Sequence, residues 1–339
     1  MRPFAYERVA SVESAVDAAS WRATETEPPT GAPAQFLAGG TTILDLMKLD
    51  VMRPEHLVDI NALQHDHDAI EVSGDGLRLS AMARMSDVAN HATIMREYPV
   101  IAQSLSLAAS QQLRNMATLG GNVLQRTRCT YFRDVTWTCN KREPGSGCSA
   151  MGGFNRMHAI LGTSDACIAT YPGDFAQALI ALDADVHVFG RNGYRTLTFA
   201  QLHRAPGEAP QVETTLAPGD LITGFTVRAG PWTRRSLYLK IRDRASYEFA
   251  LASAAVALDM DGDTVREARI ALGGVATVPW RAHGAEAALA GKRLDEAVAR
   301  AAAEVAFADA TTHEHNAFKV PLGKETLTRA LLETAALEQ

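Results

Sequence analysis

Four cysteines are the residues of this 339-residue chain best suited to metal or redox chemistry. Cys129, Cys139, Cys148 and Cys167 lie within residues 129–167, and the rest of the chain has none. Their spacing contains no CxxC pair, so it matches neither a bacterial ferredoxin run nor a standard zinc knuckle. Four thiolates from one long loop and the segment after it could still ligate a [4Fe–4S] cluster. The alternatives are a structural zinc site that includes His158, two disulfides, or four free thiols.

The segment that carries the cysteines has two further properties that suit a cluster. Residues 124–158 are irregular and longer than an ordinary connection. Their glycines would supply the sharp turns that wrapping a cluster needs: Gly145, Gly147, Gly152 and Gly153, followed by Gly162. Their basic side chains would offset the negative charge of thiolate ligands: Arg126, Arg128, Arg133, Lys141 and Arg142.

Two Gly-Gly corners are the second feature with chemical meaning. One is Gly39-Gly40-Thr41-Thr42 after the apolar residues 35–38, and the other is Gly120-Gly121-Asn122 after the apolar residues 116–119. Each apolar run is expected to be a strand. A diphosphate needs close backbone approach together with hydroxyl and amide donors, which such corners supply. Neither corner fits GxGxxG or GxxxxGK[ST], which argues against a Rossmann or P-loop site. One elongated dinucleotide across both corners is the better interpretation, and FAD pairs naturally with iron–sulfur chemistry.

The elements that must position these residues alternate between strands and helices. A helix is expected over residues 12–23, a strand over 35–38 that runs into the first corner, and a hairpin over 69–72 and 77–81. Strands at 166–170 and 185–189 are expected to flank a helix over 175–182. After a Pro- and Gly-rich stretch, a further unit should contain strands and helices at 221–228, 236–242, 250–259 and 265–273, and three Ala-rich helices at 284–290, 294–308 and 324–337.

Composition and charge exclude several classes of protein. Hydrophobic residues make up 47% and charged residues 21% of the chain, which is typical of a globular protein rather than a disordered or fibrous one. The net charge of −6 argues against nucleic-acid binding. The longest largely apolar run, Phe249–Leu258, is about half the length that spans a bilayer, so no membrane segment is expected. No signal peptide is visible, so the chain is expected in the cytoplasm or in the periplasm by co-export with a partner.

Both corners resemble the FAD-binding signatures of the molybdenum hydroxylases, in the flavin-carrying medium subunit of the xanthine dehydrogenase and carbon monoxide dehydrogenase family. The resemblance continues through Tyr171–Asp174, Leu221–Thr223, Tyr238–Lys240 and Leu272–Ala276. The segments 128–134 and 139–148 are more specific, and they are similar to the flavin subunit of bacterial periplasmic aldehyde oxidoreductase, which holds a [4Fe–4S] cluster.

The resemblance implies an α+β fold in which a two-part PCMH-type FAD-binding domain precedes a smaller α+β C-terminal domain of the carbon monoxide dehydrogenase flavoprotein type. The implied parts are an N-terminal FAD-binding subdomain (1–60), a second subdomain (61–220) and a C-terminal domain (221–339). The Cys-rich loop, at 124–167, belongs to the second subdomain. The resemblance also makes the cluster the preferred reading of the cysteines, with Cys167 as the fourth ligand.

Roles for individual residues follow from the same resemblance. Backbone amides of 36–43 and 118–122 would hold the diphosphate, Asp174 would accept from ribose or adenosine hydroxyls, and Lys240 would lie at the flavin pyrimidine edge. Without the resemblance, Asp174 reads as a helix-terminal charge and Lys240 as a surface lysine. The full set of implied FAD-binding residues is Phe36, Leu37, Ala38, Gly39, Gly40, Thr41, Thr42, Ile43, Ala108, Thr118, Gly120, Gly121, Asn122, Asp174, Leu221, Ile222 and Lys240.

The function implied is electron transfer rather than bond-breaking on a substrate, since no nucleophile–base pair or zinc-hydrolase motif is present. Electrons would pass from a large molybdenum-cofactor subunit through [2Fe–2S] clusters of a small subunit to this FAD and then to an external acceptor. The basic loop would suit an acidic ferredoxin-like acceptor. Two alternatives remain: a free-standing FAD oxidase of the vanillyl-alcohol type, and a non-enzymatic zinc- or nucleotide-binding scaffold.

Overall fold

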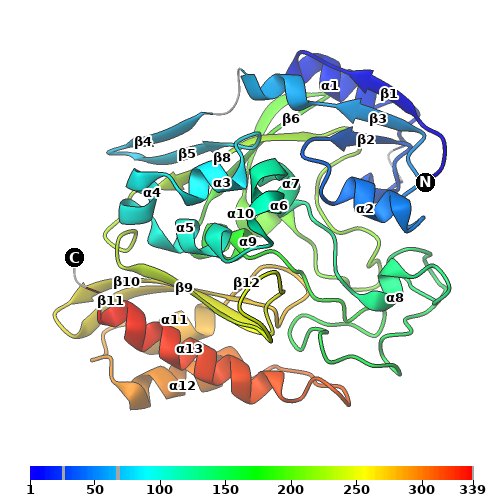
Figure 1. The fold of residues 1–339 in the computed structure, drawn as a ribbon. Helices are drawn as coiled ribbons and strands as arrows, with labels where there is room; N and C mark the ends of the chain where they lie inside the picture. The colour runs from blue at the N-terminus through cyan, green and yellow to red at the C-terminus, as the bar shows by residue number, and fades with distance from the viewer. Residues whose placement is uncertain (25–26, 66–68, 338–339) are drawn as a thin grey trace.

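Three β-sheets, each with its own helices, make up the computed structural model of the chain over the residues it describes, 1–24, 27–65 and 69–337 (Figure 1). They follow one another along the sequence, and the Cys-rich segment with the short helix α8 (Thr130–Arg133) projects at one side as an irregular loop. The α+β fold expected from the sequence is confirmed.

The N-terminal unit is a parallel three-stranded sheet with one covering helix. Helix α1 begins where Ser11 and Ser14 form a reciprocal capping box, and it buries one apolar face that includes Val12 and Val16. That face packs on Val58 of the sheet, which places helix and sheet in one core. The elements are β1 (Ala5–Arg8), α1 (Val12–Ala19), η1 (Pro29–Gly31), β2 (Ala34–Leu37), α2 (Ile43–Lys48), β3 (His56–Asp59) and η2 (Asn61–His65), with strand order β1-β3-β2.

The middle unit is an antiparallel five-stranded sheet of order β4-β5-β8-β6-β7. Its strands are β4 (Ile70–Ser73), β5 (Gly76–Ser80), β6 (Asp185–Gly190), β7 (Gly193–Thr198) and β8 (Leu221–Arg228). Its helices are α3 (Met85–Ala89), α4 (Ala92–Glu97), α5 (Pro99–Ser106), α6 (Gln111–Met116), α7 (Leu119–Val123), α9 (Phe175–Ala181) and α10 (Phe199–Leu202). Strand β8 falls within the range expected for the C-terminal domain (221–339), and in the structure it lies between β5 and β6 of the middle sheet.

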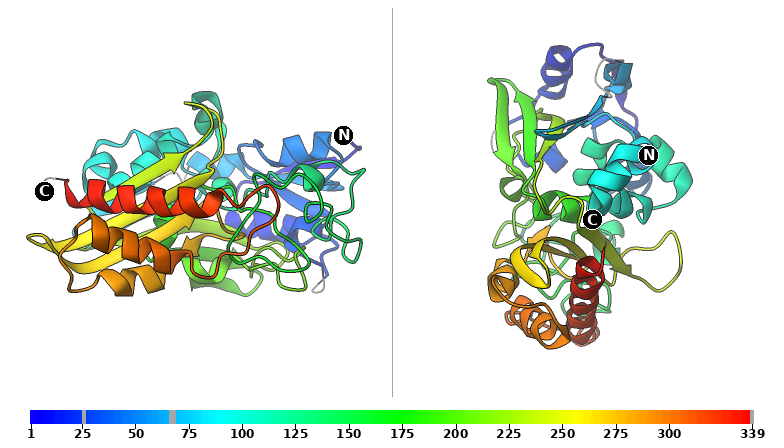
Figure 2. Two further views of the ribbon diagram at one scale, coloured as in Figure 1. Left: turned by 90° about the horizontal axis from the view of Figure 1, so that it is seen from below. Right: turned by 90° about the vertical axis from the view of Figure 1, so that its left-hand side faces the viewer.

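The C-terminal unit is an antiparallel four-stranded sheet covered on both faces. Helices α11 (His283–Leu289), α12 (Glu296–Ala306) and α13 (Lys319–Ala335) pack on one face, and α5 and α9 of the middle unit contact the other (Figures 1 and 2). The middle and C-terminal units are therefore joined by a shared helix layer. The strands are β9 (Ser236–Ile241), β10 (Ala252–Asp261), β11 (Thr264–Gly273) and β12 (Trp280–Arg281), in the order β12-β11-β10-β9.

Two expected strands do not form. Residues 166–170 are irregular, with one isolated bridge between Ser164 and Cys167. The segment 116–119 is the end of α6, a linker and the start of α7, so the second Gly-Gly corner opens a short helix instead of ending a strand. In both segments the apolar residues pack against neighbours without a partner strand, and apolar runs this short do not distinguish strand from loop or helix.

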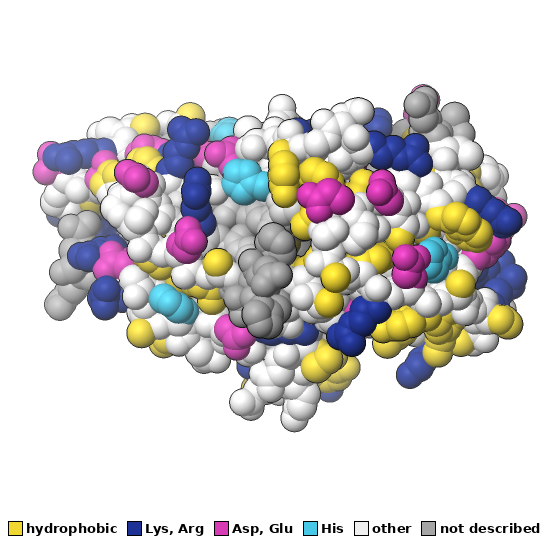
Figure 3. Space-filling view, turned by 90° about the horizontal axis from the view of Figure 1, so that it is seen from above, with side chains coloured by type: hydrophobic (Ala, Val, Ile, Leu, Met, Phe, Trp, Pro, Cys, Tyr) yellow, Lys and Arg dark blue, Asp and Glu magenta, His cyan; other side chains and the backbone are white. Residues whose placement is uncertain are grey.

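The charged side chains on one face of the molecule are of both signs. On the face seen from above, positive and negative side chains are interspersed with apolar ones instead of forming one basic field (Figure 3). Among the described residues, every helix is too short or too polar to cross a bilayer.

Candidate functional site

The first Gly-Gly corner connects β2 to α2. Gly40 has a φ of +75°, which favours glycine, and its carbonyl accepts the first hydrogen bond of α2 from the Leu44 amide. The side-chain Nδ2 of Asn61 donates to Ala38 O at 2.9 Å and fixes the path of the backbone into the corner. The hydroxyl of Thr42 makes no capping bond to α2, so it is free to bond to a ligand.

The second corner lies along the segment that follows β5. Backbone bonds join Leu119 N to Ala83 O and Gly120 N to Ala81 O, which holds 117–120 beside 81–85. Thr118 caps α7 by accepting from the Gly121 amide at 3.3 Å. The side-chain oxygen of Asn122 is buried and has no hydrogen-bond partner among the described residues. A buried amide oxygen without a partner is costly, so this atom is prepared for a donor that a ligand would bring.

The two corners touch each other. A Cβ atom on Gly39 would lie 2.0 Å from the carbonyl oxygen of Met116 and 3.0 Å from Cα of Ala117. The two backbones therefore lie so close together that only glycine fits at position 39. This contact brings the N-terminal and middle units together and places the two glycine corners beside one cavity.

One cavity runs along both corners. Twelve of the residues expected to bind FAD are among those that line it: Phe36, Ala38, Gly39, Gly40, Thr41, Thr42, Ile43, Thr118, Gly120, Gly121, Leu221 and Ile222. Ala81 and Met82 complete the wall beside Leu221, and Tyr171, His203 and Glu213 line its far part. Apart from Tyr171, which begins a segment of the family resemblance, no local sequence signal marks these residues, because they come from separate elements that only the fold brings together.

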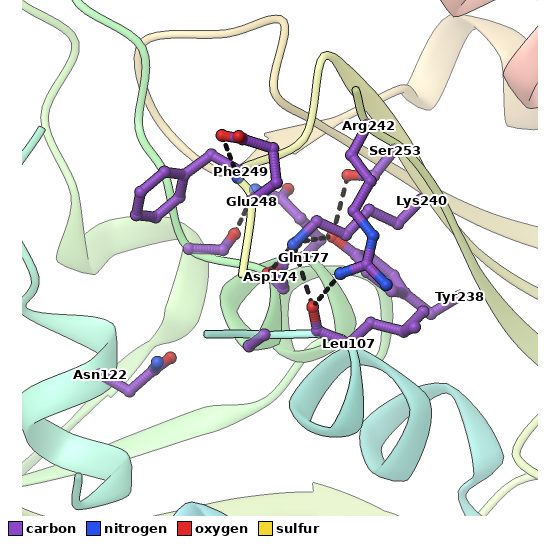
Figure 4. Close-up of polar contacts among 12 residues, drawn as sticks. Leu107, Asn122, Asp174, Gln177, Tyr238, Lys240, Arg242, Glu248, Phe249 and Ser253 are labelled. Atoms are coloured by element: carbon purple, nitrogen blue, oxygen red, sulfur yellow. Dashed lines mark hydrogen bonds and ion pairs between the residues drawn. The ribbon is translucent and has the colours of Figure 1, made fainter. Parts of the chain in front are cut away.

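The remaining expected residues lie outside that lining: Leu37, Ala108, Asn122, Asp174 and Lys240. Asp174 and Lys240 form a buried ion pair of 2.8 Å, and their side chains are 5% and 1% exposed. The surface-lysine reading of Lys240 is thus wrong. Tyr238 donates from its hydroxyl to the other Asp174 oxygen at 2.7 Å (Figure 4). Residues 238 and 240 share a face of β9, so the period-two pattern of the strand could have indicated this neighbour.

The four cysteines converge in the irregular loop and none forms a disulfide. Cys139 and Cys148 face each other across an isolated antiparallel bridge, and Cys129 Sγ lies 3.1 Å from His158 Nε2. Burial raises the pKa of Cys129 to about 12, and the nearby Cys139 and Cys167 contribute to this rise. No three His, Cys, Asp or Glu side chains within the described residues are grouped tightly enough to hold a metal ion. The metal site expected from the sequence, whether a cluster or zinc, is therefore not assembled among them.

Each basic residue of the loop already has a partner within the protein. Arg126 and Lys141 pair with the buried Glu213 at 2.6 and 3.0 Å, and these charges hold the pKa of Glu213 below its usual value despite burial. Arg133 pairs with Asp45 at 2.7 Å. Arg142 donates to backbone carbonyls, and the half-buried Arg128 stacks on Phe249. These charges tie the loop to the body of the protein, and an acidic ferredoxin-like partner stays a prediction.

The fold thus has three units, and the paired glycine corners of the first two border one cavity. Two family models match the chain: residues 2–227 match the FAD binding domain in molybdopterin dehydrogenase, and residues 237–334 match the CO dehydrogenase flavoprotein C-terminal domain. The chain belongs to this family of oxidoreductase flavin subunits.

Comparison with individual proteins leads to the same family. The chain is 44% identical over 337 residues to the aldehyde oxidoreductase FAD-binding subunit PaoB of Escherichia coli K12, and the match covers 99% of each chain. It is 27% identical to the carbon monoxide dehydrogenase medium chain of Hydrogenophaga pseudoflava, over 82% of this chain and 79% of that one. Reconstituted CO dehydrogenase from Oligotropha carboxidovorans has the same fold, with a TM-score of 0.75, 24% identity and 99% coverage of both chains.

Proposed function

We propose that this chain is the electron-transfer flavin subunit of a molybdenum-containing aldehyde oxidoreductase. The observation that carries the proposal is the contact between the two glycine corners, which border one cavity in a chain of this family. The full-length relative at 44% identity is named as an aldehyde oxidoreductase subunit, which supports an aldehyde as the substrate of the complex.

The residues present fit FAD. Gly39, Gly40, Gly120 and Gly121 allow close backbone approach, and Thr41 and Thr42 offer hydroxyls toward the diphosphate. The unpartnered Asn122 oxygen would accept from a donor on the cofactor. Leu221 and Ile222 would cover an apolar ring face. Bound FAD would supply the capacity to take up electron pairs and to release electrons singly.

The role of Asn122 gives a direct test of the FAD site. Replacing Asn122 with Ala should weaken FAD binding by about tenfold or more, since one buried polar contact is lost. The measurement is a fluorescence titration of the full chain with FAD. Asn90→Ala, at an exposed site on the end of α3, is the matched control and should bind as the unaltered chain does. Equal FAD affinity of both variants would show that Asn122 is not part of the FAD site.

We also propose that Cys129, Cys139, Cys148 and Cys167 ligate a [4Fe–4S] cluster. Four free thiols converging in one loop are the donor set of such a cluster, and a cluster is wider than a single ion, so its ligands stand further apart. Cys167 also lines the cavity of the glycine corners, which supports a redox centre next to FAD. The loop would act as the cluster's scaffold, held to the protein by Glu213.

Iron and sulfide analysis tests the cluster. The complex should contain about four iron and four sulfide per copy of this chain in addition to those of its partners. Cys167→Ser should remove them, and Ser164→Ala, in the same turn, should keep them. A full complement in Cys167→Ser would make the assignment of the fourth ligand wrong, and stoichiometric zinc in place of iron would overturn the cluster.

The partners are a large molybdenum-cofactor subunit and a small [2Fe–2S] subunit, which would oxidise the substrate and deliver its electrons here. The chain's own residues then bind FAD and hold it for an external acceptor. A ferredoxin-like acceptor stays a prediction, and the engaged basic residues of the loop give it no support.

A further inference from the structure

Arg84 lies where the N-terminal and middle units meet, just before the first residue of α3. Its backbone is tied to the second glycine corner, because Arg84 forms an isolated antiparallel bridge with Thr118. Its guanidinium group donates through Nη1 to the carbonyl oxygen of Met116, and through Nη2 to Gln64 Oε1 at 2.7 Å and to Asn61 Oδ1 at 3.3 Å. One side chain therefore bonds the segment before the second corner to η2 of the N-terminal unit.

Both ends of this connection lead to the glycine corners. The carbonyl group of Met116 is the one that stands against Gly39, where a Cβ atom would lie 2.0 Å from its oxygen. At the other end, Asn61 donates from Nδ2 to the carbonyl oxygen of Ala38, the residue before that glycine. The Arg84 side chain is thus bonded to a group next to each corner.

An arginine side chain suits a contact of this kind. Its planar guanidinium group carries five N–H donors in a fixed fork, so it can bond to oxygens of two segments and hold their spacing. Arg84 is half-buried and is not among the residues that line the cavity of the corners. It therefore reaches the corners through Met116 and Asn61 and not through direct contact with a ligand.

We propose that Arg84 is a positioning residue of the FAD site, which clips the two glycine corners together at the spacing that the diphosphate requires. This inference rests on the proposed FAD site. Without the clip the two units would stay joined through a shared core, in which Met82 and Leu221 of the middle unit pack with Val58 of the N-terminal unit. The corners would be freer to move apart in the FAD-free chain, and binding would have to restore their spacing at a cost in affinity.

A double-mutant cycle on FAD affinity, measured by fluorescence titration of the full chain, tests the clip. Arg84→Met removes all three side-chain bonds and should weaken FAD binding by about tenfold. Gln64→Met removes one of them and should weaken binding by about threefold in the unaltered chain. In the Arg84→Met background the same change should have no effect, because its partner is already gone. Arg78→Met, at an exposed position of β5, is the matched control and should bind FAD as the unaltered chain does.

Salt separates the clip from a direct attraction between the Arg84 charge and the diphosphate. The clip consists of hydrogen bonds to uncharged oxygens, so the loss of affinity in Arg84→Met should be the same at about 0.1 M and at about 1 M salt. A loss that disappears at the higher salt concentration would assign Arg84 to charge attraction and would overturn the clip.

The remaining outcomes also decide the proposal. Unchanged affinity in Arg84→Met would show that the corners keep their spacing without Arg84, and an equal effect of Gln64→Met in both backgrounds would show that Gln64 acts without it. If Arg84→Met does not fold, Gln64→Met decides alone, and an FAD affinity equal to that of Arg78→Met overturns the inference. If the unaltered chain binds no FAD, the proposed FAD site is wrong as well, whereas equal binding by the unaltered chain and Arg84→Met refutes the clip alone.

Discussion

At the scale of single residues, Gly39 is the glycine of the two corners that leaves least room for a side chain. Its missing side chain lets the two corners meet, with the Met116 carbonyl where a Cβ would stand. This corner could be predicted from the sequence, because Gly-Gly-Thr-Thr after an apolar run indicates a strand that turns into a helix. The sequence did not predict the pairing of Asp174 with Lys240, whose contact depends on the packing of α9 against β10 and β11 beside β9.

Gly39→Ala should therefore separate the corners. The alanine Cβ would lie 2.0 Å from a backbone oxygen, so one of the two segments must move. We expect FAD affinity to fall by at least about tenfold, an energy of about 1.4 kcal/mol, as measured by equilibrium titration. Gly74→Ala, where a Cβ would meet nothing within 4 Å, is the control. Unchanged affinity in Gly39→Ala would show that the corners do not form the site.

The buried Lys319 should make the free energy of unfolding depend on pH. It is fully buried at the start of α13, donates to the carbonyls of Met157 and Gly274, and burial lowers its pKa from 10.5 to about 7. Above pH 7 the unfolded chain therefore binds more protons than the folded chain, so the free energy of unfolding should rise with pH. The slope between about pH 7 and 8.5 should reach up to about 1.4 kcal/mol per unit.

Urea unfolding of the full chain at several pH values measures this slope. Lys319→Met should flatten it, since the titrating group is gone, whereas Lys292→Met at an exposed site should keep it. An equal slope in Lys319→Met would assign the pH dependence to another group.

At the scale of elements, the cysteine loop is held by charge as well as by packing. Its length and its glycines predicted an irregular segment correctly, but the sequence could not show that Glu213, far along the chain, neutralises Arg126 and Lys141. The two expected strands at 116–119 and 166–170 failed for a related reason. Their apolar residues are buried by contacts with distant segments, and local pattern does not record those contacts.

Glu213→Gln should loosen this loop. Removing one partner of a buried charge network costs about 3 kcal/mol, because Arg126 and Lys141 keep their charge without a counter-ion. Hydrogen exchange over residues 126–148 should become faster, while α12 should exchange as before. Glu208→Gln, an exposed neighbour, should change neither. Equal protection of the loop in Glu213→Gln would contradict its role as an anchor.

At the scale of the whole molecule, the cavity of the glycine corners is lined mainly by the N-terminal and middle units, and the C-terminal unit adds Thr277 and Val278. The order of these units was predictable, because the motifs run along the chain in the same order. The place of β8 in the middle sheet was not, since β8 pairs with β5 and β6, which lie far before it in sequence. All three units therefore have to be present for the flavin site as we propose it.

Anaerobic addition of an aldehyde to the purified complex tests the central claim most directly. If the chain is the electron-transfer flavin subunit, the oxidised flavin absorbance should bleach as the aldehyde is consumed, and a complex with Gly39→Ala should lack this signal. A flavin that stays oxidised while the aldehyde is oxidised, or a complex that turns over aldehyde with no flavin in this chain, would contradict the account.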